Sequence, residues 1–583
     1  MTSSKKHFGI LARVRVIEVV LFLIFLIFTF RLFYLQILRG SYYSKLAIAN
    51  QQKQYEIAPE RGTLYARDGD RTVPLVLNEK RYRLVADPTL IKKIEQTADA
   101  LKSYGDYSEI KKQLENKDLR YTVLAKKLTE VQASEIRKLE LAGVFLEETS
   151  QRIYPQGSLA ASLLGFVNDE AEGKYGVEQA LNDRLKGTPG KVKAITDHNG
   201  VPLLANGDNI ETPSVDGEEV VLSIDVGMQQ QVEEILKNGL ANANSKSGGL
   251  IVMRPDNGEV VAMASYPTYD PAKIEEQKDP SVFINSNVAS PYEVGSVMKP
   301  LTVAAALNSG VVNANTTFYD PGYVIADGKT ITNVEEDGGA GTRTLELIIT
   351  MSLNTGASQM LKYMGGGDFT KAGREKWHDY LVNHYRFGQK TGIEQGYEEG
   401  GIVPDPNEGF GLNIRYANTT FGQGTSQTPI QMAAAFSALV NGGTYYQPTL
   451  VHSIKQADGS LKPHQPTVLA RDVLSSSDSQ QVTGYMQTLV ERFYSAAARP
   501  GYRVGGKTGT AQIADPNGGY YADRFNGSFV GFIGGDKIEY VVYVRVDDPK
   551  VQGYAGLKAA GPIFVTAAQM LLNNFNIQPK TAK

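Results

Sequence analysis

Residues 292–303 read YEVGSVMKPLTV, which places Lys299 three positions after Ser296 at the start of an apolar run. Pro300 is tolerated in the first turn of a helix, so the segment predicts a helix that begins here. Residues three apart share a helix face, which puts the hydroxyl beside the amine near the helix N-terminus. A lysine buried among apolar residues loses proton affinity and can serve as a base. Serine and lysine at this spacing are common by chance, so the pair needs support from elsewhere in the chain.

Two further stretches offer complementary chemistry. Ser352 and Asn354 lie in MSLNTG between helical stretches, and a hydroxyl and a carboxamide at this spacing can relay a proton and hold a peptide carbonyl. Residues 507–510 read KTGT and lie just before the last predicted strands. They offer a positive charge, two hydroxyls and a glycine that lets a substrate backbone approach closely. This combination indicates an edge that binds a carboxylate.

Two similar motifs are interpreted differently. A second Lys-Thr-Gly, residues 390–392, precedes an acidic, glycine-rich loop rather than a terminal strand, so we interpret it as structural. Residues 501–508, GYRVGGKT, match the phosphate-binding pattern G-x-x-x-x-G-K-[ST], but that mechanism needs a strand before the loop and a helix after it. Proline and glycines in residues 511–525 break any such helix. We therefore exclude a nucleotide site at 501–508.

The composition excludes several classes of function. The 583 residues carry a net charge of −3 and their basic residues are scattered, so nucleic acid is not an expected partner. The chain has no cysteine, which excludes disulfides, thiolate metal sites and a cysteine nucleophile. The six histidines show no paired metal-binding spacing and are expected on the surface or in loops.

The N-terminus carries an apolar segment, residues 16–38. Its uncharged core, residues 19–30, spans about 18 Å as a helix, and this is shorter than the helix of ~20 residues that usually crosses a membrane. The span becomes adequate if the side chain of Arg31 snorkels to an interface. No small-residue cleavage site follows, which favours a retained transmembrane anchor over a cleaved signal peptide. Four basic residues precede the segment: Lys5, Lys6, Arg13 and Arg15. They place residues 1–15 in the cytoplasm and the rest of the chain on the other side of the membrane.

The chain beyond the anchor divides at a polar, turn-rich stretch, residues 206–217. Residues 39–213 mix short β-like and helical runs, as in a mixed pedestal domain. Residues 214–576 begin with a strand, a helix and a hairpin and end with two strands and a helix. They predict one antiparallel sheet covered by the terminal helices, with a mostly helical middle. Residues 577–583 are expected to be a frayed tail.

Ser-x-x-Lys, Ser-x-Asn and Lys-Thr-Gly in this order are the signature of serine β-lactamases and penicillin-binding proteins. The chain resembles the class B, high-molecular-weight penicillin-binding proteins, which have an anchor, a non-catalytic pedestal and a C-terminal D,D-transpeptidase domain. The resemblance implies the α/β (α+β) β-lactamase/transpeptidase fold, an antiparallel sheet flanked by helices plus a helical subdomain. Other stretches that carry it are ASYPTYDP, FGQGTSQTPIQMAAAF and SFVGFIG, and in the pedestal ERGTLYARDG and KYGVEQALNDRLKGTPG. The pedestal match is looser, since Ala66 stands where the family usually has aspartate.

The resemblance implies a role for each residue of the first two motifs. Ser296 would attack the carbonyl of a D-alanyl-D-alanine stem peptide, and Lys299 would take its proton. Ser352 would pass a proton to the departing D-alanine, and Asn354 would hold the substrate amide. The acyl-enzyme would then be attacked by an amine of a neighbouring stem peptide, forming a cross-link.

The third motif would bind the substrate's terminal carboxylate. Lys507 acts there with Thr508, Gly509 and Thr510, and the backbone N–H groups of Ser296 and Thr510 would form the oxyanion hole. The resemblance implies no metal and no cofactor. It also implies β-lactam antibiotics as acylating ligands and, by analogy alone, a membrane-embedded glycosyltransferase and other wall-synthesis or division proteins as partners.

Several alternatives stay open from the residues. Water could take the acyl group, as in a D,D-carboxypeptidase or β-lactamase, and a non-catalytic β-lactam sensor or wall-synthesis scaffold would share the motifs. The leading hypothesis is a transpeptidase in a bacterial cell membrane with one spanning helix and an extracytoplasmic catalytic domain. In the pedestal, Arg61, Arg67 and Glu178 form ion pairs or are separately solvated.

Overall fold

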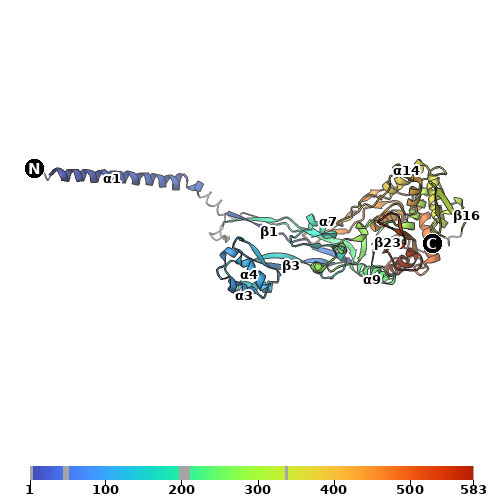
Figure 1. Cartoon of the computed structure of the whole chain (residues 1–583), viewed down its shortest axis with the longest axis horizontal. Coiled ribbons are helices and arrows are strands. Elements are labelled where there is room, and N and C mark those ends of the chain that lie inside the picture. The colour runs from blue at the N-terminus through green and yellow to red at the C-terminus, as the bar shows by residue number, and fades with distance from the viewer. Residues whose placement is uncertain (1–3, 44–51, 196–209, 335–338, 582–583) are drawn as a thin grey trace. The chain divides into compact units, whose positions relative to one another are not determined.

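The computed structural model describes residues 4–43, 52–195, 210–334 and 339–581, and the chain divides into two compact units (Figure 1). Unit 1 comprises Met1–Glu60 and Gly187–Asp216. Unit 2 comprises Arg61–Lys186 and Gly217–Lys583, so it holds both most of the predicted pedestal and the predicted catalytic region.

Unit 1 contains the N-terminal helix and a small sheet. Helix α1 (Ser4–Phe33) runs on into a π-helical turn, η1 (Tyr34–Leu38). The stretch Arg13–Leu38 is long and apolar enough to cross a membrane, with a mean hydropathy of 2.6. Its helix continues past Arg31, so the span is longer than the uncharged core suggested.

The sheet of unit 1 is antiparallel, in the order β1-β8-β9. Its strands are β1 (Gln52–Ile57), β8 (Gly190–Ile195) and β9 (Ile210–Thr212).

The pedestal part of unit 2 is a mixed α+β module, as expected. Its strands are β2 (Leu64–Asp68), β3 (Arg71–Ala86), β4 (Thr122–Leu128), β5 (Val144–Ile153), β6 (Phe166–Val167) and β7 (Gly173–Lys174). Its helices are η2 (Pro88–Leu90), α3 (Ile94–Leu101), α4 (Tyr107–Glu115), α5 (Glu130–Arg137), α6 (Ala161–Leu164), α7 (Gly176–Ala180) and α8 (Asn182–Leu185). Helices α3, α4 and α5 bury their apolar stripes against β3 and β4 in a separate small core.

One sheet continues from the pedestal into the following region. Strand β10 (Glu219–Asp225) pairs in parallel with β2 and antiparallel with β18 (Val451–Lys455). The full strand order is β19-β18-β10-β2-β3-β4, where β19 is Leu461–Pro463, and β5 pairs with β3. The predicted boundary between pedestal and catalytic region, near residue 217, therefore falls within one hydrogen-bonded sheet. Turn-forming residues in the sequence alone do not separate the two regions there.

The predicted catalytic region is built on a second, five-stranded sheet in the order β12-β11-β23-β22-β21, with every neighbouring pair antiparallel. The strands are β11 (Ser247–Met253), β12 (Val260–Tyr266), β21 (Arg503–Ala514), β22 (Tyr520–Gly534) and β23 (Ile538–Asp547). Helices α9 (Val226–Asn242) and α18 (Gly561–Asn574) pack against it, and α16 (Pro429–Val440) is buried along its whole length in the same core. The predicted antiparallel sheet with terminal helices is confirmed, and Figure 1 shows α9 and β23 in the same body.

The region between the sheet's front and back strands is mostly helical. Its helical elements are η3 (Pro271–Glu276), η4 (Pro280–Phe283), α10 (Ser286–Ala289), η5 (Gly295–Met298), α11 (Lys299–Asn308), α12 (Leu345–Thr350), α13 (Asn354–Met364), α14 (Lys371–Asp379), η7 (Tyr380–His384), α15 (Leu412–Thr419) and α17 (Ser476–Phe493). Short strands interrupt it: β13 (Thr317–Asp320), β14 (Tyr323–Ala326), β15 (Lys329–Thr332), β16 (Gly341–Thr344), β17 (Tyr445–Tyr446), β19 (Leu461–Pro463) and β20 (Val468–Ala470). The sequence did not predict the β13–β16 and β14–β15 pairs, because their strands have only four residues each.

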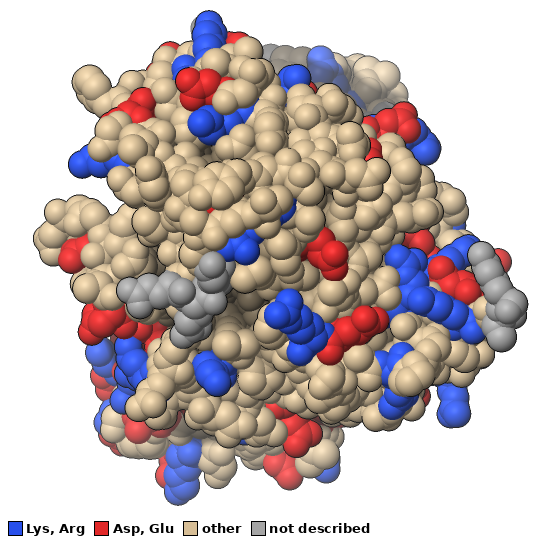
Figure 2. All heavy atoms as spheres, turned by 90° about the vertical axis from the view of Figure 1, so that its right-hand side faces the viewer, with Lys and Arg blue, Asp and Glu red and all other residues tan. Residues whose placement is uncertain are grey.

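The C-terminal residues pack rather than fray. The side chain of Ile577 is buried in the main core, and the backbone N–H of Lys580 donates to the carbonyl of Gly501 at 2.6 Å. The expectation of a frayed tail is therefore wrong for residues up to Thr581, which donates to Asp536 at 3.1 Å. On the face drawn in Figure 2, basic and acidic side chains are interspersed over the described residues.

Candidate active site

Ser296 lies in the turn η5 directly before α11, at the helix start that the sequence predicted. Gly295 adopts a left-handed backbone with φ of +67°, which glycine reaches without strain. A Cβ on Gly295 would lie 2.7 Å from the carbonyl oxygen of Thr510, and the backbone N–H of Gly295 donates to Gly422 at 3.0 Å. The turn that carries Ser296 is thus held between strand β21 and the loop around Gly422.

Lys299 is fully buried and points to the second motif. Its Nζ donates to Asn354 Oδ1 at 2.8 Å, to Ser352 Oγ at 3.1 Å and to the carbonyl oxygen of Ser352. A buried amine needs such acceptors, because an unpaired charge in an apolar interior is very costly. The first two motifs therefore meet through side-chain contacts.

Ser352 occupies the turn between α12 and α13 in a left-handed conformation, with φ of +59°. This region is unfavourable for a serine, and such strained residues cluster at functional sites. The neighbouring Leu353 is buried, which anchors the turn, and α13 starts at Asn354. The carboxamide of Asn354 also donates to the carbonyl of Thr332 at 3.1 Å, so both ends of its side chain are held.

Lys507 brings the third motif to the same atom. It lies on β21 with 1% of its surface exposed, and its Nζ donates to Ser352 Oγ at 3.0 Å. It also donates to the carbonyl and hydroxyl oxygens of Thr508, at 3.1 and 3.3 Å. With Lys299 and Lys507 both donating to it, the hydroxyl of Ser352 has both lone pairs occupied, and its own proton is available to an acceptor.

The remaining residues of the third motif, Thr508, Gly509 and Thr510, lie on the same strand, β21. The hydroxyl of Thr510 accepts the backbone N–H of Gly556, the first residue of η8 (Gly556–Ala560), at 2.9 Å. A Cβ on Gly509 would lie 2.2 Å from Ser528 Oγ and 2.6 Å from the carbonyl oxygen of Val294. The sequence analysis attributed this glycine to the close approach of a substrate backbone. In the structure, the atoms that crowd the Cβ position of Gly509 belong to Ser528 and Val294 of the protein itself.

The second Lys-Thr-Gly has a different environment. The backbone N–H and hydroxyl of Thr391 donate to Glu398 Oε1 at 2.5 and 2.6 Å, and the N–H of Gly392 donates to Oε2 at 3.0 Å. Glu398 thus folds the loop on itself, in agreement with the structural interpretation. Residues 501–508 likewise lead into β21, which continues to Ala514 without the helix that a phosphate loop requires.

Sequence reasoning missed Glu293, which lies three residues before Ser296. Its Oε1 accepts the hydroxyl of Tyr520, on β22, and the backbone N–H of Gly424, both at 2.8 Å. Burial raises the pKa of Glu293, against the lowering effect of these two hydrogen bonds. Only contacts between distant segments reveal this residue, because a single glutamate in a loop carries no pattern.

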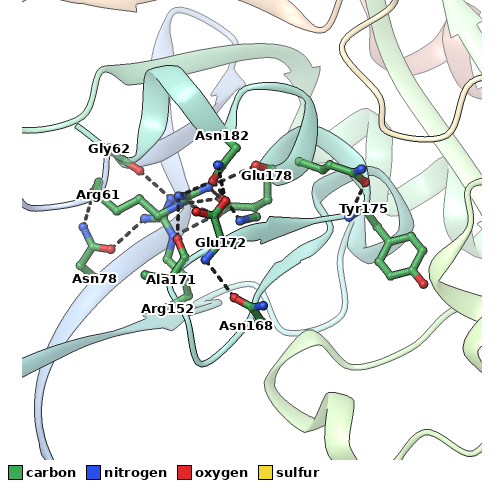
Figure 3. Close-up of polar contacts among 12 residues, drawn as sticks. Arg61, Gly62, Asn78, Arg152, Asn168, Ala171, Glu172, Tyr175, Glu178 and Asn182 are labelled. Carbon is green, nitrogen blue, oxygen red and sulfur yellow. Dashed lines mark hydrogen bonds and ion pairs between the residues drawn. The ribbon is translucent and has the colours of Figure 1, made fainter. Parts of the chain in front are cut away.

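A buried charge cluster lies in the pedestal, and Figure 3 shows its contacts. Glu178 is fully buried; Arg61 donates to its Oε2 from Nε at 2.8 Å and from Nη2 at 2.6 Å, and Arg152 donates to its Oε1 at 2.9 Å. Arg61 also donates to Asn182, and Arg152 to Asn78. The cluster joins segments far apart in the pedestal sequence.

The ion pair proposed for Arg61 and Glu178 is confirmed, while Arg67 is a β2 residue paired with Thr72 and lies outside the cluster. Sequence reasoning missed Arg152. Burial lowers the pKa of the Arg152 guanidinium, and the neighbouring Glu178 carboxylate partly offsets this effect.

Comparison with known proteins agrees with this architecture. The family model for the penicillin binding protein transpeptidase domain matches residues 248–569, and the penicillin-binding protein dimerisation domain matches residues 56–222. Stage V sporulation protein D of Bacillus subtilis is 35% identical over 98% of this chain and 87% of its own. Peptidoglycan D,D-transpeptidase FtsI of Escherichia coli is 28% identical over 79% of this chain and 73% of its own.

Solved structures show the same fold. Penicillin binding protein 2X from Streptococcus thermophilus has a TM-score of 0.70 and 23% identity, covering 90% of this chain and 80% of that one. Penicillin binding protein 3 from Mycobacterium tuberculosis, complexed with aztreonam, has a TM-score of 0.67 and 24% identity, covering 90% and 98%. The chain therefore belongs to the penicillin-binding protein transpeptidases.

Proposed function

We propose that this chain is a serine D,D-transpeptidase that cross-links peptidoglycan stem peptides through an acyl-enzyme on Ser296. The observation that carries the proposal is the meeting of three sequence motifs at one atom, Oγ of Ser352, which accepts from both Lys299 and Lys507. The activity named for the Escherichia coli relative fits this arrangement. We assign residues 214–576 to the catalytic domain and 39–213 to the pedestal.

In the acylation step, Ser296 Oγ forms a bond to the penultimate D-alanine carbonyl carbon, and the bond to the terminal D-alanine nitrogen breaks. Lys299 accepts the serine proton, which requires a neutral amine. Ser352 donates its own hydroxyl proton to the departing nitrogen and takes the serine proton from Lys299 in its place, through the contact between Lys299 Nζ and Ser352 Oγ.

The same site holds the substrate in place. Asn354 binds the stem-peptide amide, and Lys507 with Thr508 and Thr510 binds the terminal carboxylate by charge-assisted hydrogen bonds. The backbone N–H groups of Ser296 and Thr510 donate to the developing oxyanion, each worth about 3–4 kcal/mol. An acceptor amine from another stem peptide then attacks the ester carbonyl carbon. The bond from this carbon to Ser296 Oγ breaks, and the proton lost by the amine passes through Lys299 to Ser296 Oγ, which completes the cross-link.

The anchor sets the compartment. Basic residues in the first half of α1, ahead of its apolar stretch, favour an N-terminus in the cytoplasm and a catalytic domain outside the membrane, where peptidoglycan lies. β-lactams acylate Ser296 as substrate mimics, in line with the aztreonam complex of the Mycobacterium tuberculosis protein. A membrane-embedded glycosyltransferase that supplies uncross-linked glycan is the proposed partner.

The test uses the full chain in detergent with a fluorescent penicillin. Wild type should acquire a stable label at one site, and Ser296→Ala should acquire none. Rapid loss of the label would favour a β-lactamase. Stem-peptide dimers formed in vitro distinguish the transpeptidase from a carboxypeptidase, sensor or scaffold. Folded wild type that takes up no label would refute the assignment.

A further inference from the structure

A buried carboxylate lies behind the second motif. Asp320, the last residue of β13, has 1% of its surface exposed. Three groups donate to it: the backbone N–H of Gly322 at 2.8 Å, Asn333 Nδ2 at 3.0 Å and the hydroxyl of Thr355 at 2.6 Å. These donors are all neutral. Burying a carboxylate among neutral donors costs free energy that a purely apolar packing would avoid, so the position calls for a reason.

The cluster ties two chain segments to each other. Asn333 Oδ1 accepts the backbone N–H of Thr355 at 3.1 Å and lies 2.9 Å from its hydroxyl. Thr355 is in the first turn of α13, where a helix has unpaired N–H groups and favours negative charge. Asp320 thus holds the end of β15 against the start of α13.

These two segments carry the contacts of Asn354. Thr332 precedes Asn333, and its carbonyl accepts from Asn354 Nδ2 at 3.1 Å. Asn354 precedes Thr355, and its Oδ1 accepts from Lys299 at 2.8 Å. The distance between the end of β15 and the start of α13 therefore determines whether the carboxamide of Asn354 can hydrogen-bond to Thr332 and Lys299 at the same time.

We infer that Asp320, acting through Asn333 and Thr355, is a positioning residue that sets Asn354 for acyl transfer. This inference rests on the proposed function, because it concerns the same site. Nothing in the cluster touches the reacting atoms; it fixes where the carboxamide lies. Weakening it should slow acylation without changing how many molecules can be acylated.

The first test compares Thr355→Val and Thr355→Ser in the full chain in detergent. Valine keeps the shape and removes the hydroxyl; serine keeps the hydroxyl. We expect Thr355→Val to lower the second-order rate of acylation by a fluorescent penicillin about tenfold, and Thr355→Ser to stay within about twofold, since small displacements of positioning groups have large kinetic effects. The final labelled fraction should match wild type for both. Ser437→Ala, at a buried serine of α16 whose hydroxyl donates to the carbonyl of Ala433 in the same helix, is the control and should keep the wild-type rate.

A purely structural role would lower the labelled fraction and leave the rate of the folded molecules unchanged, which would overturn the inference. If Thr355→Val does not fold, the inference is tested instead by exchanging the side chains of residues 320 and 333. Asp320→Asn places an amide against the Asn333 amide and should slow acylation, whereas Asp320→Asn with Asn333→Asp restores a donor opposite an acceptor and should recover most of the rate. An exchange variant no faster than Asp320→Asn alone would also overturn it. Failure of wild type to label would instead contradict the proposed function.

Discussion

The side-chain amines of Lys299 and Lys507 converge on one atom, Oγ of Ser352, at 3.1 and 3.0 Å. One amine comes from the first turn of a helix and the other from an edge strand of the central sheet. Both are buried, so the arrangement is part of the packed interior rather than a surface coincidence. Ser352 is therefore the residue through which the side chains of all three motifs are connected.

Lys507→Ala should lower the acylation rate by about 10- to 100-fold, since a hydrogen bond from a charged donor contributes about 1.5–3 kcal/mol. Penicillin acylation kinetics with the full chain measure this. The second Lys-Thr-Gly offers a matched control, because Lys390 is exposed and its loop is folded around Glu398. Lys390→Ala should acylate like wild type; equal losses in both variants would contradict the assignment of Lys507.

Gly556→Ala should impair the site by displacing β21. A Cβ on Gly556 would lie 2.2 Å from the carbonyl oxygen of Gly509, so η8 has to move away and the hydrogen bond to Thr510 is lost. We expect slower acylation together with a lower melting temperature. Gly484 in α17 has open space at its Cβ position, and Gly484→Ala should be neutral or stabilising by up to about 1 kcal/mol. Wild-type acylation in Gly556→Ala would show that this contact does not position the strand.

Glu178→Ala should destabilise the pedestal by about 3–5 kcal/mol, because it leaves two buried guanidinium groups without their carboxylate. The midpoint of urea unfolding, followed by circular dichroism, measures the loss. Glu218→Ala removes the exposed ion pair with Arg184 and should change the free energy of unfolding by no more than about 1 kcal/mol. Similar effects of the two variants would mean that the cluster of Arg61, Arg152 and Glu178 contributes no more than a surface pair.

The partly buried carboxylate of Glu233 predicts a pH dependence of stability. Burial raises the pKa of Glu233, against the lowering effect of hydrogen bonds from Gln229 and the backbone of Ala160. Its charged form is therefore costlier in the folded than in the unfolded state, and this cost appears as the pH rises above the ordinary value of 4.5. Relative to wild type, Glu233→Gln should become progressively more stable from pH 4.5 upward.

Urea midpoints over this pH range measure the effect. Glu234→Gln, one position further on α9 and exposed, is the matched control and should show a nearly constant difference from wild type. A difference for Glu233→Gln that stays constant, or that shrinks with rising pH, would contradict the prediction.

The sequence predicted the antiparallel sheet because its strands are long apolar runs at the two ends of the catalytic region, with turn residues between them. It did not predict the four-residue strands β13 to β16, where tertiary contacts rather than local pattern determine the structure. For the same reason Asp320, Asn333 and Glu293 carried no signal: each is one polar residue in a short segment, and only its distant partners give it a role.

What the sequence determined by itself is the chemistry available: a serine and a lysine one turn apart, a serine–asparagine pair, a Lys-Thr-Gly strand and an apolar N-terminal helix, because spacing and residue type are local properties. Only the tertiary structure decided that Lys299 and Lys507 meet at the hydroxyl of Ser352 and that Arg152 pairs with Glu178. The physical reason is burial, because a charged side chain removed from water is stable only where segments distant in the sequence supply its hydrogen-bond and ion-pair partners.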